Sequence, residues 1–325
     1  MTIKDIAEKA GVSIATVSYV LNGKKKVSEQ TRIKIQKIIQ ESGYEFNGAA
    51  RDLKNKQNNI VGICLESLRG PFFSELIDGI ETAATDVEYN FIITTNIGGE
   101  RSSAVKILSE RRVDGAIILS PNLSNEFIHS LVLKNIPLVL LDRKFEHDRV
   151  NTILLNNRSG IQQAIEHLHQ KALTKIAFLS GVETHFDNKE RVAAYIETME
   201  KIHLKHEIQI YKGNFRQESG RNLATQIISK EIPMPEAIIC ANDEMAIGVI
   251  HALKEHGFNI PQDISIIGFD DILVSRYIQP LLSTISHPKF ELGKLAFETL
   301  LSLLKGEKIE NVTFDTLFIP RESSL

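Results

Sequence analysis

The sequence has little cysteine and no long apolar run. Its 325 residues include two cysteines, Cys64 and Cys240, each inside a short apolar run. This pattern favours buried thiols in a reducing compartment over a disulfide or a reactive nucleophile. No apolar run reaches the roughly 18 residues that a membrane span needs, and the first residues lack the apolar core of a secretory signal. We therefore expect a cytoplasmic protein with no membrane partner.

The short motifs of metal and nucleotide chemistry are also missing. The sequence contains no HExxH, P-loop, GxGxxG or CxxC pattern, and Ser180-Gly181 lacks the flanking residues of a nucleophile elbow. Two close histidine pairs, His167 with His169 and His203 with His206, are interpreted as surface histidines on helices rather than metal ligands. We predict no cofactor, no metal site and no catalytic residue, and hence a protein that is not an enzyme.

Positive charge is concentrated near the N-terminus. Residues 1–58 carry 11 Lys+Arg and 6 Asp+Glu, a net charge of +5, which leaves 27 basic and 35 acidic residues, a net charge of −8, for the rest. The length predicts about two large domains, or two and a small one. A small basic segment on a large acidic body is typical of a nucleic-acid-binding module, although a solvated charged helix would have the same charge.

The first 46 residues predict three short helices. Thr2 and Asp5 have the spacing of a capping box, Ser13 is a good N-cap for a helix over residues 14–21, and Ser28 is an N-cap for a third helix. Two short helices joined by a tight glycine turn form a helix-turn-helix, whose second helix fits the major groove of DNA. The face of that helix expected to point outward is formed by Ile14, Ala15, Ser18 and Tyr19.

This segment resembles the DNA-binding headpiece of the lac repressor/galactose repressor (LacI/GalR) family. The family pattern is close to T-x-x-D-(I/V)-A-x-x-A-G-V-S-x-x-T-V-S-x-x-(L/I)-N-G, and the chain matches it at Thr2, Asp5, Ala7, Ala10, Gly11, Val12, Ser13, Thr16, Val17, Ser18, Leu21, Asn22 and Gly23. The resemblance implies that Ile14, Ala15 and Tyr19 occupy the base-reading positions. Many members have arginine where Tyr19 stands, so a bidentate guanine contact is missing. The headpiece residues expected to contact DNA are Thr2, Ser13, Ile14, Ala15, Thr16, Ser18, Tyr19 and Asn22.

Residues 47–59 are polar and by themselves resemble a flexible linker. The family has here a short hinge helix that forms on operator DNA. The resemblance implies that Asn47 begins this helix, that Ala50 and Arg51 belong to it, and that Leu53 wedges into the minor groove. So short a helix is unstable alone in water, so we expect it to order only when two copies pack on DNA. Phe46 stands where the family has a proline.

From residue 60 the chain alternates short apolar strands with amphipathic helices, which predicts parallel sheets covered by helices on both faces. The expected strands are Ile60–Leu65, Asn90–Thr95, Gly115–Ser120, Pro137–Leu141, Lys175–Ser180, Ile208–Tyr211, Ala237–Cys240 and Ile264–Gly268. These strands and helices are too many for a single α/β lobe, so they predict two similar lobes. We expect the ligand to bind in a cleft between the lobes, at the carboxyl ends of the strands.

The predicted fold is a small all-α helix-turn-helix headpiece joined to an α/β two-lobe body of the periplasmic-binding-protein type. The expected division is a headpiece at 1–46, a hinge at 47–59, and an effector-binding and dimerisation domain at 60–325. The resemblance continues through the body and implies lobes at about 60–156 with 286–311, and about 157–285 with 312–325.

Nine residues are the expected effector contacts. Phe72 is expected to stack on the ligand while Phe73 belongs partly to the core, and Arg191 matches the family's effector arginine, with a surface ion pair as the alternative. Asn242 and Asp270 directly follow apolar strands, and their oxygens suit sugar hydroxyls. The resemblance adds the remaining positions. The full set is Phe72, Phe73, Asp142, His185, Asp187, Arg191, Phe215, Asn242 and Asp270.

These features predict a transcriptional repressor that binds double-stranded operator DNA as a homodimer and answers to a small-molecule effector. A sugar or sugar derivative is the expected effector; a purine, a nucleoside or a protein co-regulator is the alternative. A solute-binding transport protein would have a signal peptide and no helix-turn-helix, and a sugar-modifying enzyme would have a catalytic constellation at its strand ends. No heptad tail follows Arg321-Glu322-Ser323-Ser324-Leu325, so a dimer is expected rather than a coiled-coil tetramer.

Overall fold

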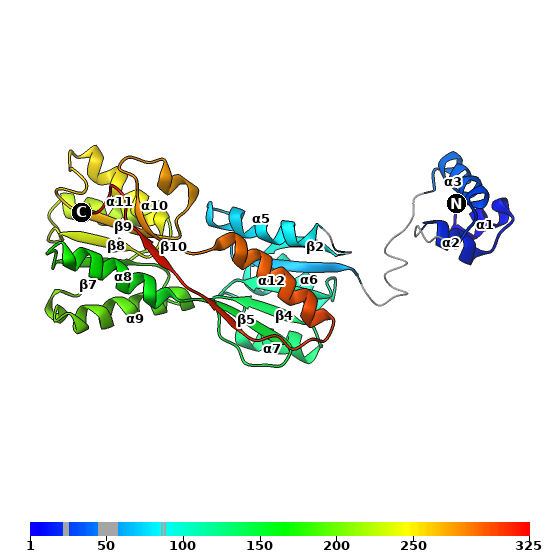
Figure 1. Ribbon diagram of the computed structural model, residues 1–325, viewed down its shortest axis with the longest axis horizontal. Coiled ribbons are helices and arrows are strands. Elements are labelled where there is room, and N and C mark those ends of the chain that lie inside the picture. Colours follow the sequence, from blue (N-terminus) through cyan, green and yellow to red (C-terminus); the bar gives the residue numbers. More distant parts are fainter. Residues whose placement is uncertain (22–25, 45–57, 86, 88) are drawn as a thin grey trace. The chain divides into compact units, whose positions relative to one another are not determined.

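Figure 1 shows the computed structural model of the chain. It describes residues 1–21, 26–44, 58–85, 87 and 89–325. They form two compact units, Met1–Asn58 and Asn59–Leu325. Within the described part of the chain, no helix is both long enough and apolar enough to span a bilayer.

Among its described residues, the N-terminal unit has three helices, α1 (Ile3–Ala10), α2 (Ile14–Leu21) and α3 (Glu29–Ser42). Ile6, Val17 and Ile35 are fully buried at the centre of its small core. Gly11 ends α1 in the left-handed conformation, at φ 66°, which favours glycine because it has no Cβ. The predicted capping box at Thr2, the N-caps at Ser13 and Ser28, and the three helices are confirmed.

The first lobe of the body is a six-stranded parallel sheet in the order β11-β5-β4-β3-β1-β2. Its strands are β1 (Ile60–Leu65), β2 (Asn90–Thr95), β3 (Gly115–Leu119), β4 (Leu138–Leu141), β5 (Val150–Leu155) and β11 (Val312–Phe314). Its helices are α5 (Phe72–Ala84), α6 (Ser103–Ser109), α7 (Asn125–Leu133) and α12 (Lys289–Leu304), with a 3-10 turn η1 (Gly99–Arg101). Alternate strand residues enter two separate cores, one on each face of the sheet.

The second lobe repeats this plan, with the strand order β12-β10-β9-β8-β6-β7. Its strands are β6 (Ile176–Ser180), β7 (Gln209–Lys212), β8 (Ala237–Cys240), β9 (Ser265–Phe269), β10 (Ser283–Ser286) and β12 (Leu317–Ile319). Its helices are α8 (Asn157–Gln170), α9 (Phe186–Lys201), α10 (Gln217–Ile228) and α11 (Asp243–Glu255), with 3-10 turns η2 (Lys205–Glu207) and η3 (Leu273–Arg276). All neighbouring strands are parallel except β10 and β12.

The chain crosses between the lobes three times, before α8, before α12 and between β11 and β12. Figure 1 shows the last crossing as the red C-terminal segment. The lobe boundary expected between residues 311 and 312 is wrong by a few residues. Val312–Phe314 pair with β5 of the first lobe, and Phe314 packs against that lobe's core, so this crossing lies at 315–316.

Both cysteines are free and fully buried in strands. Burial raises the pKa of the Cys64 thiol to about 12, and burial followed by the charge of Asp243 raises the pKa of Cys240. Thiols with such raised pKa values are poor nucleophiles at neutral pH.

Candidate functional site

The exposed end of α2 is the candidate nucleic-acid surface of the N-terminal unit. The Ser13 hydroxyl accepts a hydrogen bond from the Thr16 amide at 3.1 Å and so caps the first turn of this helix. Ile14 is 48% exposed although it is apolar, whereas Val17 and Val20 on the opposite face are buried. An exposed isoleucine at a helix N-terminus has no partner in the headpiece core and is suited to contact with another molecule.

The other predicted DNA-contacting residues that the structure describes are all at least partly exposed. Thr2, Ser13 and Ala15 are exposed, and Thr16, Ser18 and Tyr19 are partly exposed. The predicted residues Asn22, Asn47, Ala50, Arg51 and Leu53 lie outside the described residues.

In the body, polar side chains that follow the strands of the two lobes lie together. Glu66 follows β1 in the first lobe, and its Oε1 lies 3.5 Å from Nε2 of His185, which begins α9 in the second lobe. The hydrogen bond from His185 lowers the pKa of Glu66. We call the set Glu66, Asp142, His185, Asp187, Arg191 and Asp270 the inter-lobe polar cluster.

Arg191 lies in α9 and only 3% of it is exposed. Its Nε donates to Oδ1 of Asn157 at 2.8 Å, its Nη1 donates to the carbonyl of Ala241 at 2.5 Å, and its Nη2 is 3.4 Å from Oδ2 of Asp187. The guanidinium stacks on the ring of Phe269 at 3.6 Å. This burial is incompatible with the surface ion pair considered as the alternative role of Arg191.

Asp142 ends β4 in the left-handed conformation, at φ 50°. Its Oδ1 is buried and makes no hydrogen bond to the described residues. Burial and then the negative charge of Asp187 raise the pKa of Asp142 to about 7, with a further rise from Asp270 and an opposing effect of Arg191. A buried carboxylate oxygen without a donor is unfavourable, so this group is suited to a hydrogen-bond donor that arrives from outside.

Asp270 and Asp271 follow β9 and point to different partners. Oδ1 of Asp270 lies 3.4 Å from Nε2 of His287, whereas the carboxylate of Asp271 binds Arg276 and Arg321. The two carboxylates therefore do not face one substrate as an acid/base pair.

Aromatic rings flank the cluster. Phe72 and Phe73, at the start of α5, meet edge to face at 5.2 Å; Phe73 packs against the first-lobe core, while Phe72 lies 5.7 Å from the ring of His287. The ring of Phe215 is tilted against His185 at 5.5 Å. Phe72 and Phe215 thus place apolar surface beside the polar groups.

Asn242, which is an expected effector contact, has both ends of its amide engaged within the body. Its Oδ1 caps α11 by accepting from the Met245 amide at 3.0 Å, and its Nδ2 donates to the carbonyl of Phe215 at 3.0 Å. In this conformation it fixes the Phe215 loop to α11, which is a positioning contribution.

Comparison with known proteins finds matches in both the N-terminal unit and the body. Residues 2–47 match the family of bacterial regulatory proteins of the lacI type, and residues 165–324 match the periplasmic binding protein-like domain. The chain is 36% identical over 322 residues to the HTH-type transcriptional repressor PurR of Vibrio atlanticus, covering 97% of this chain and 95% of that protein. The chain belongs to the LacI family. It is therefore a DNA-binding transcriptional repressor with an effector-binding body, in a family that is not enzymatic.

Solved structures support the assignment to the LacI family. The lac repressor dimer bound to operator and the anti-inducer ONPF is 28% identical, has a TM-score of 0.85, and covers 100% of this chain and 99% of its own. A sugar-binding transcriptional regulator of the LacI family from Enterococcus faecalis is 34% identical, has a TM-score of 0.76, and covers 83% of this chain and 98% of its own.

Sequence reasoning missed several buried polar groups of this LacI-family body. Nδ2 of Asn96 and Oγ of Ser120, at the ends of β2 and β3, are buried without a hydrogen-bond partner among the described residues, like Oδ1 of Asp142. Lys289 is buried, donates to the Asp270 carbonyl at 2.5 Å and lies 3.6 Å from Glu75. A polar residue directly after an apolar strand is the signal that would have found Asn96 and Ser120.

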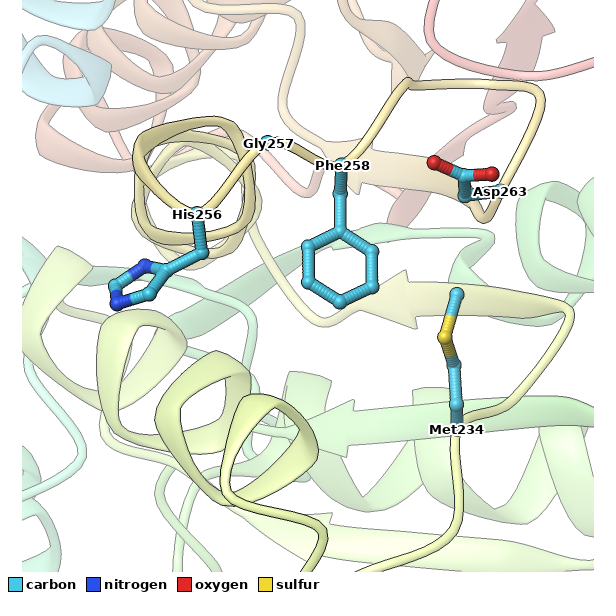
Figure 2. A pocket seen from close by; sticks show the side chains of 5 residues that line it. All are labelled: Met234, His256, Gly257, Phe258 and Asp263. Carbon is cyan, nitrogen blue, oxygen red and sulfur yellow. The ribbon is translucent and has the colours of Figure 1, made fainter.

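A surface pocket of about 340 Å³ lies elsewhere, at the loops that precede β8 and β9. Figure 2 shows its lining residues Met234, His256, Gly257, Phe258 and Asp263. Nδ1 of His256 is already bonded to the Ala252 carbonyl, and Asp263 accepts from the Asn259 amide. The pocket lies at the opposite edge of the sheet from the strand ends. No group of three or more His, Cys, Asp or Glu side chains in the described part of the chain is arranged to hold a metal ion.

Proposed function

We propose that this repressor binds operator DNA as a homodimer and that a sugar or sugar derivative, bound between the lobes, controls its affinity for the operator. The observation that carries the proposal is the combination in one chain of an exposed α2 and a polar cluster at the strand ends of two lobes. The proposed division is a headpiece at 1–46, a hinge at 47–59 and an effector and dimerisation domain at 60–325, in a cytoplasmic protein.

In this proposal, the exposed start of α2 reads the DNA bases. Ile14, Ala15 and Tyr19 would contact base edges, and Thr2, Ser13, Thr16, Ser18 and Asn22 would help to orient the headpiece on the duplex. Ile14 is apolar and 48% exposed, which suits contact with a thymine methyl group. In the hinge, Asn47, Ala50, Arg51 and Leu53 would order on the minor groove.

The effector part rests on the groups beside the cluster. Asp142 and Asp270 provide carboxylate oxygens, and Oδ1 of Asp142 is buried and unpartnered. Phe72 and Phe215 provide apolar faces of the kind that stack on a pyranose or furanose ring. His185, Asp187 and Arg191 would complete the polar lining, with Phe73 and Asn242 holding the aromatic rings in place. The 34% identical regulator from Enterococcus faecalis, described as sugar-binding, supports this ligand class.

The homodimer is supported by apolar side chains on the surface of the body. Leu273, Val274 and Tyr277, in and after η3, are 58%, 43% and 75% exposed. Contiguous exposed apolar side chains mark an interaction surface, and a second copy of the chain would bury them. Two headpieces would then read two half-sites.

The DNA-binding part is tested by selecting operator sequences from a random pool and measuring their affinity by gel shift. We expect a palindromic preference that changes when Ile14 or Tyr19 is replaced by alanine, by about 1–3 kcal/mol for each altered base contact. Lys37→Gln, on the exposed face of α3, is the matched control and should leave the preference unchanged. Equal affinity for all sequences would contradict the proposal.

The effector part is tested by a thermal-shift screen of the intact protein against monosaccharides, disaccharides, nucleosides and purines. A ligand at 100 times its Kd adds about 2.7 kcal/mol of stability. We expect a sugar to raise Tm in a way that Asp270→Asn abolishes and that Asp148→Asn, on the exposed surface, leaves intact. A response to a purine or nucleoside alone would reject the sugar while leaving DNA binding in place.

A further inference from the structure

The charges at the centre of the inter-lobe polar cluster do not balance. Asp187 and Asp270 both act electrostatically on Asp142, and Arg191 is the cation that acts on it as well. His287 adds no positive charge at neutral pH, because burial lowers its pKa. Because the pKa of Asp142 is raised to about 7, that group is partly protonated at neutral pH, so two carboxylates and a partly charged third carboxyl group face one guanidinium.

That guanidinium has little left to offer an anion. Arg191 already donates to Asn157 and Ala241, contacts Asp187, and has one face covered by Phe269. A phosphate or carboxylate in the cluster would have to compete with these contacts. It would also lose its hydration beside fixed negative charges, which is unfavourable.

The neighbouring cations are paired or lie at the border of the cluster. Lys289 is next to Glu75, and His185 is next to Glu66. Lys144 is exposed and lies over the ring of Phe186 at 5.5 Å. Arg216 is exposed and acts electrostatically on Glu66.

The helix N-termini beside the cluster also carry acidic residues. The first turns of α5, α9 and α11 contain Glu75, Asp187 and Asp243. A helix N-terminus attracts anions through its free amide groups and its dipole. Glu75 and Asp187 place negative charge in the first turns of α5 and α9, neither of which has a side-chain cap, and this charge opposes the attraction of these helix ends for a ligand phosphate.

The unpartnered oxygen of Asp142 calls for a donor. Its Oδ1 is buried and makes no hydrogen bond to the described residues. A sugar hydroxyl can donate to it, in a neutral sugar as in a phosphorylated one, so this contact favours a polyhydroxyl ligand, while the charge of the ligand is decided by the carboxylates and Arg191.

From these contacts we infer that the effector of this repressor is an uncharged polyhydroxyl compound, and that the inter-lobe polar cluster excludes phosphorylated sugars and uronic acids. The inference rests on the proposed function, since it concerns the ligand of the same site. It restricts the proposed sugars and sugar derivatives to those that carry no charge.

The first test compares matched ligands on the intact protein by calorimetry. Glucose and galactose are each measured with their 6-phosphates and their uronic acids at constant ionic strength, and ribose is measured with its 5-phosphate. We expect that any sugar that binds is a neutral one, and that the Kd of its matched anion is at least roughly 100-fold higher. The reason is that like charges placed together are strongly unfavourable. An anionic member that binds more tightly than its neutral parent would overturn the inference.

The second test uses inorganic phosphate as the probe and does not need the effector. The Tm of the wild type should not respond to millimolar phosphate at matched ionic strength. Asp142→Asn/Asp187→Asn removes two carboxylates and frees one side of Arg191, so its Tm should rise with phosphate by a few degrees, and adding Arg191→Gln should remove that rise. Asp78→Asn/Asp148→Asn, at exposed positions of the first lobe, is the matched control.

Each outcome decides the inference separately from the proposed function. A wild-type response to phosphate that Arg191→Gln removes would overturn it, and so would a double variant that stays insensitive. If no sugar binds but the double variant gains phosphate binding, the charge inference stands and the sugar proposal fails. Gel shifts on the same samples report DNA binding independently of both results.

Discussion

At the end of β9, two adjacent aspartates have different environments and therefore different roles. Asp270 faces His287 and the inter-lobe polar cluster, while Asp271 is held between Arg276 and Arg321. The sequence shows only that both follow an apolar strand. Arg321 is 50 residues away along the chain, so the separation of the two roles is set by a long-range contact.

Asp271 gives a pH-dependent prediction. Burial raises its pKa, but hydrogen bonds from Arg276 and Arg321 outweigh burial and hold the pKa at about 2. Because this value lies below the usual one near 4, the stabilisation is present above pH 4 and is lost as the pH falls towards 2. Asp271→Asn should lower the free energy of unfolding by about 1–2 kcal/mol at pH 7, allowing for the exposed Arg276, and by less at pH 3. Urea unfolding at both pH values measures this, with Asp148→Asn as the unaffected control.

Asp142 should change the stability in the opposite direction as the pH rises. Its pKa is raised to about 7, first by burial and then by Asp187, so between pH 4 and 7 the folded chain retains a proton that the unfolded chain releases. Stability therefore falls as the pH rises from 4 to 7. Asp142→Asn should be more stable than the wild type at pH 8, by an amount on the order of 2 kcal/mol, and equal to it near pH 4. An identical difference at both pH values in thermal unfolding would contradict this explanation.

Arg191 shows how far a single residue can be read from sequence. The resemblance to the family implied that it is a functional arginine. Its partner Asn157 lies 34 residues away along the chain. That contact depends on how α8 packs against α9, which no local pattern encodes.

At the element scale, the long apolar strands and amphipathic helices were predictable because their periodicity is local. Strands β10, β11 and β12 were not expected, because Ser283–Ser286 is polar at both ends and the other two have three residues each. β5 was also absent from the expected strands. Short strands gain their stability from pairing with the sheet, so their own sequence carries little signal.

Close packing of α5 on α12 gives a prediction at this scale. A Cβ added at Gly79 would lie 2.0 Å from the carbonyl oxygen of Phe290 in α12. Gly79→Ala should therefore push the two helices apart and lower the free energy of unfolding by about 1–3 kcal/mol. Glu81→Ala, at an exposed position of the same helix, should change it little, and chemical denaturation of both variants provides the comparison. Equal stability of the two would show that the helices separate easily.

The capping box of α1 gives another prediction at the scale of a single element. The Thr2 hydroxyl accepts from the Asp5 amide at 3.3 Å, and the Asp5 carboxylate accepts from the Thr2 amide at 2.7 Å. Thr2→Ala removes the first of these bonds and should destabilise α1 by about 1 kcal/mol. Faster hydrogen exchange of the α1 amides would report it, and Thr2→Ser should restore the wild-type rate. Unchanged exchange in Thr2→Ala would mean that core packing alone holds the helix.

At the scale of the whole molecule, the two units differ in charge, with +5 for residues 1–58 and −8 for the rest. DNA binding by the basic unit should depend steeply on salt, because it releases counterions from the phosphates. We expect operator affinity to fall about 1000-fold between 50 and 200 mM salt, the loss typical of six to ten phosphate contacts.

Binding of an uncharged effector to the acidic body should change little over the same range. Fluorescence anisotropy with labelled operator and calorimetry with the effector measure the two dependences. Operator affinity that does not vary with salt would contradict a phosphate-contacting headpiece, and steep salt dependence of effector binding would point to a charged ligand.

By itself the sequence determined the helix caps, the alternation of strands and helices, and which polar residues follow a strand, since these depend on neighbours a few positions apart. The tertiary structure decided that Glu66 meets His185, that Asp142 lies near Asp187 and Asp270, that Asn242 is occupied as a cap, and that Arg191 is buried and largely saturated. Those outcomes depend on contacts between segments tens to hundreds of residues apart, made only when the two sheets and three crossings assemble. The charge balance of the cluster is therefore a property of the folded chain.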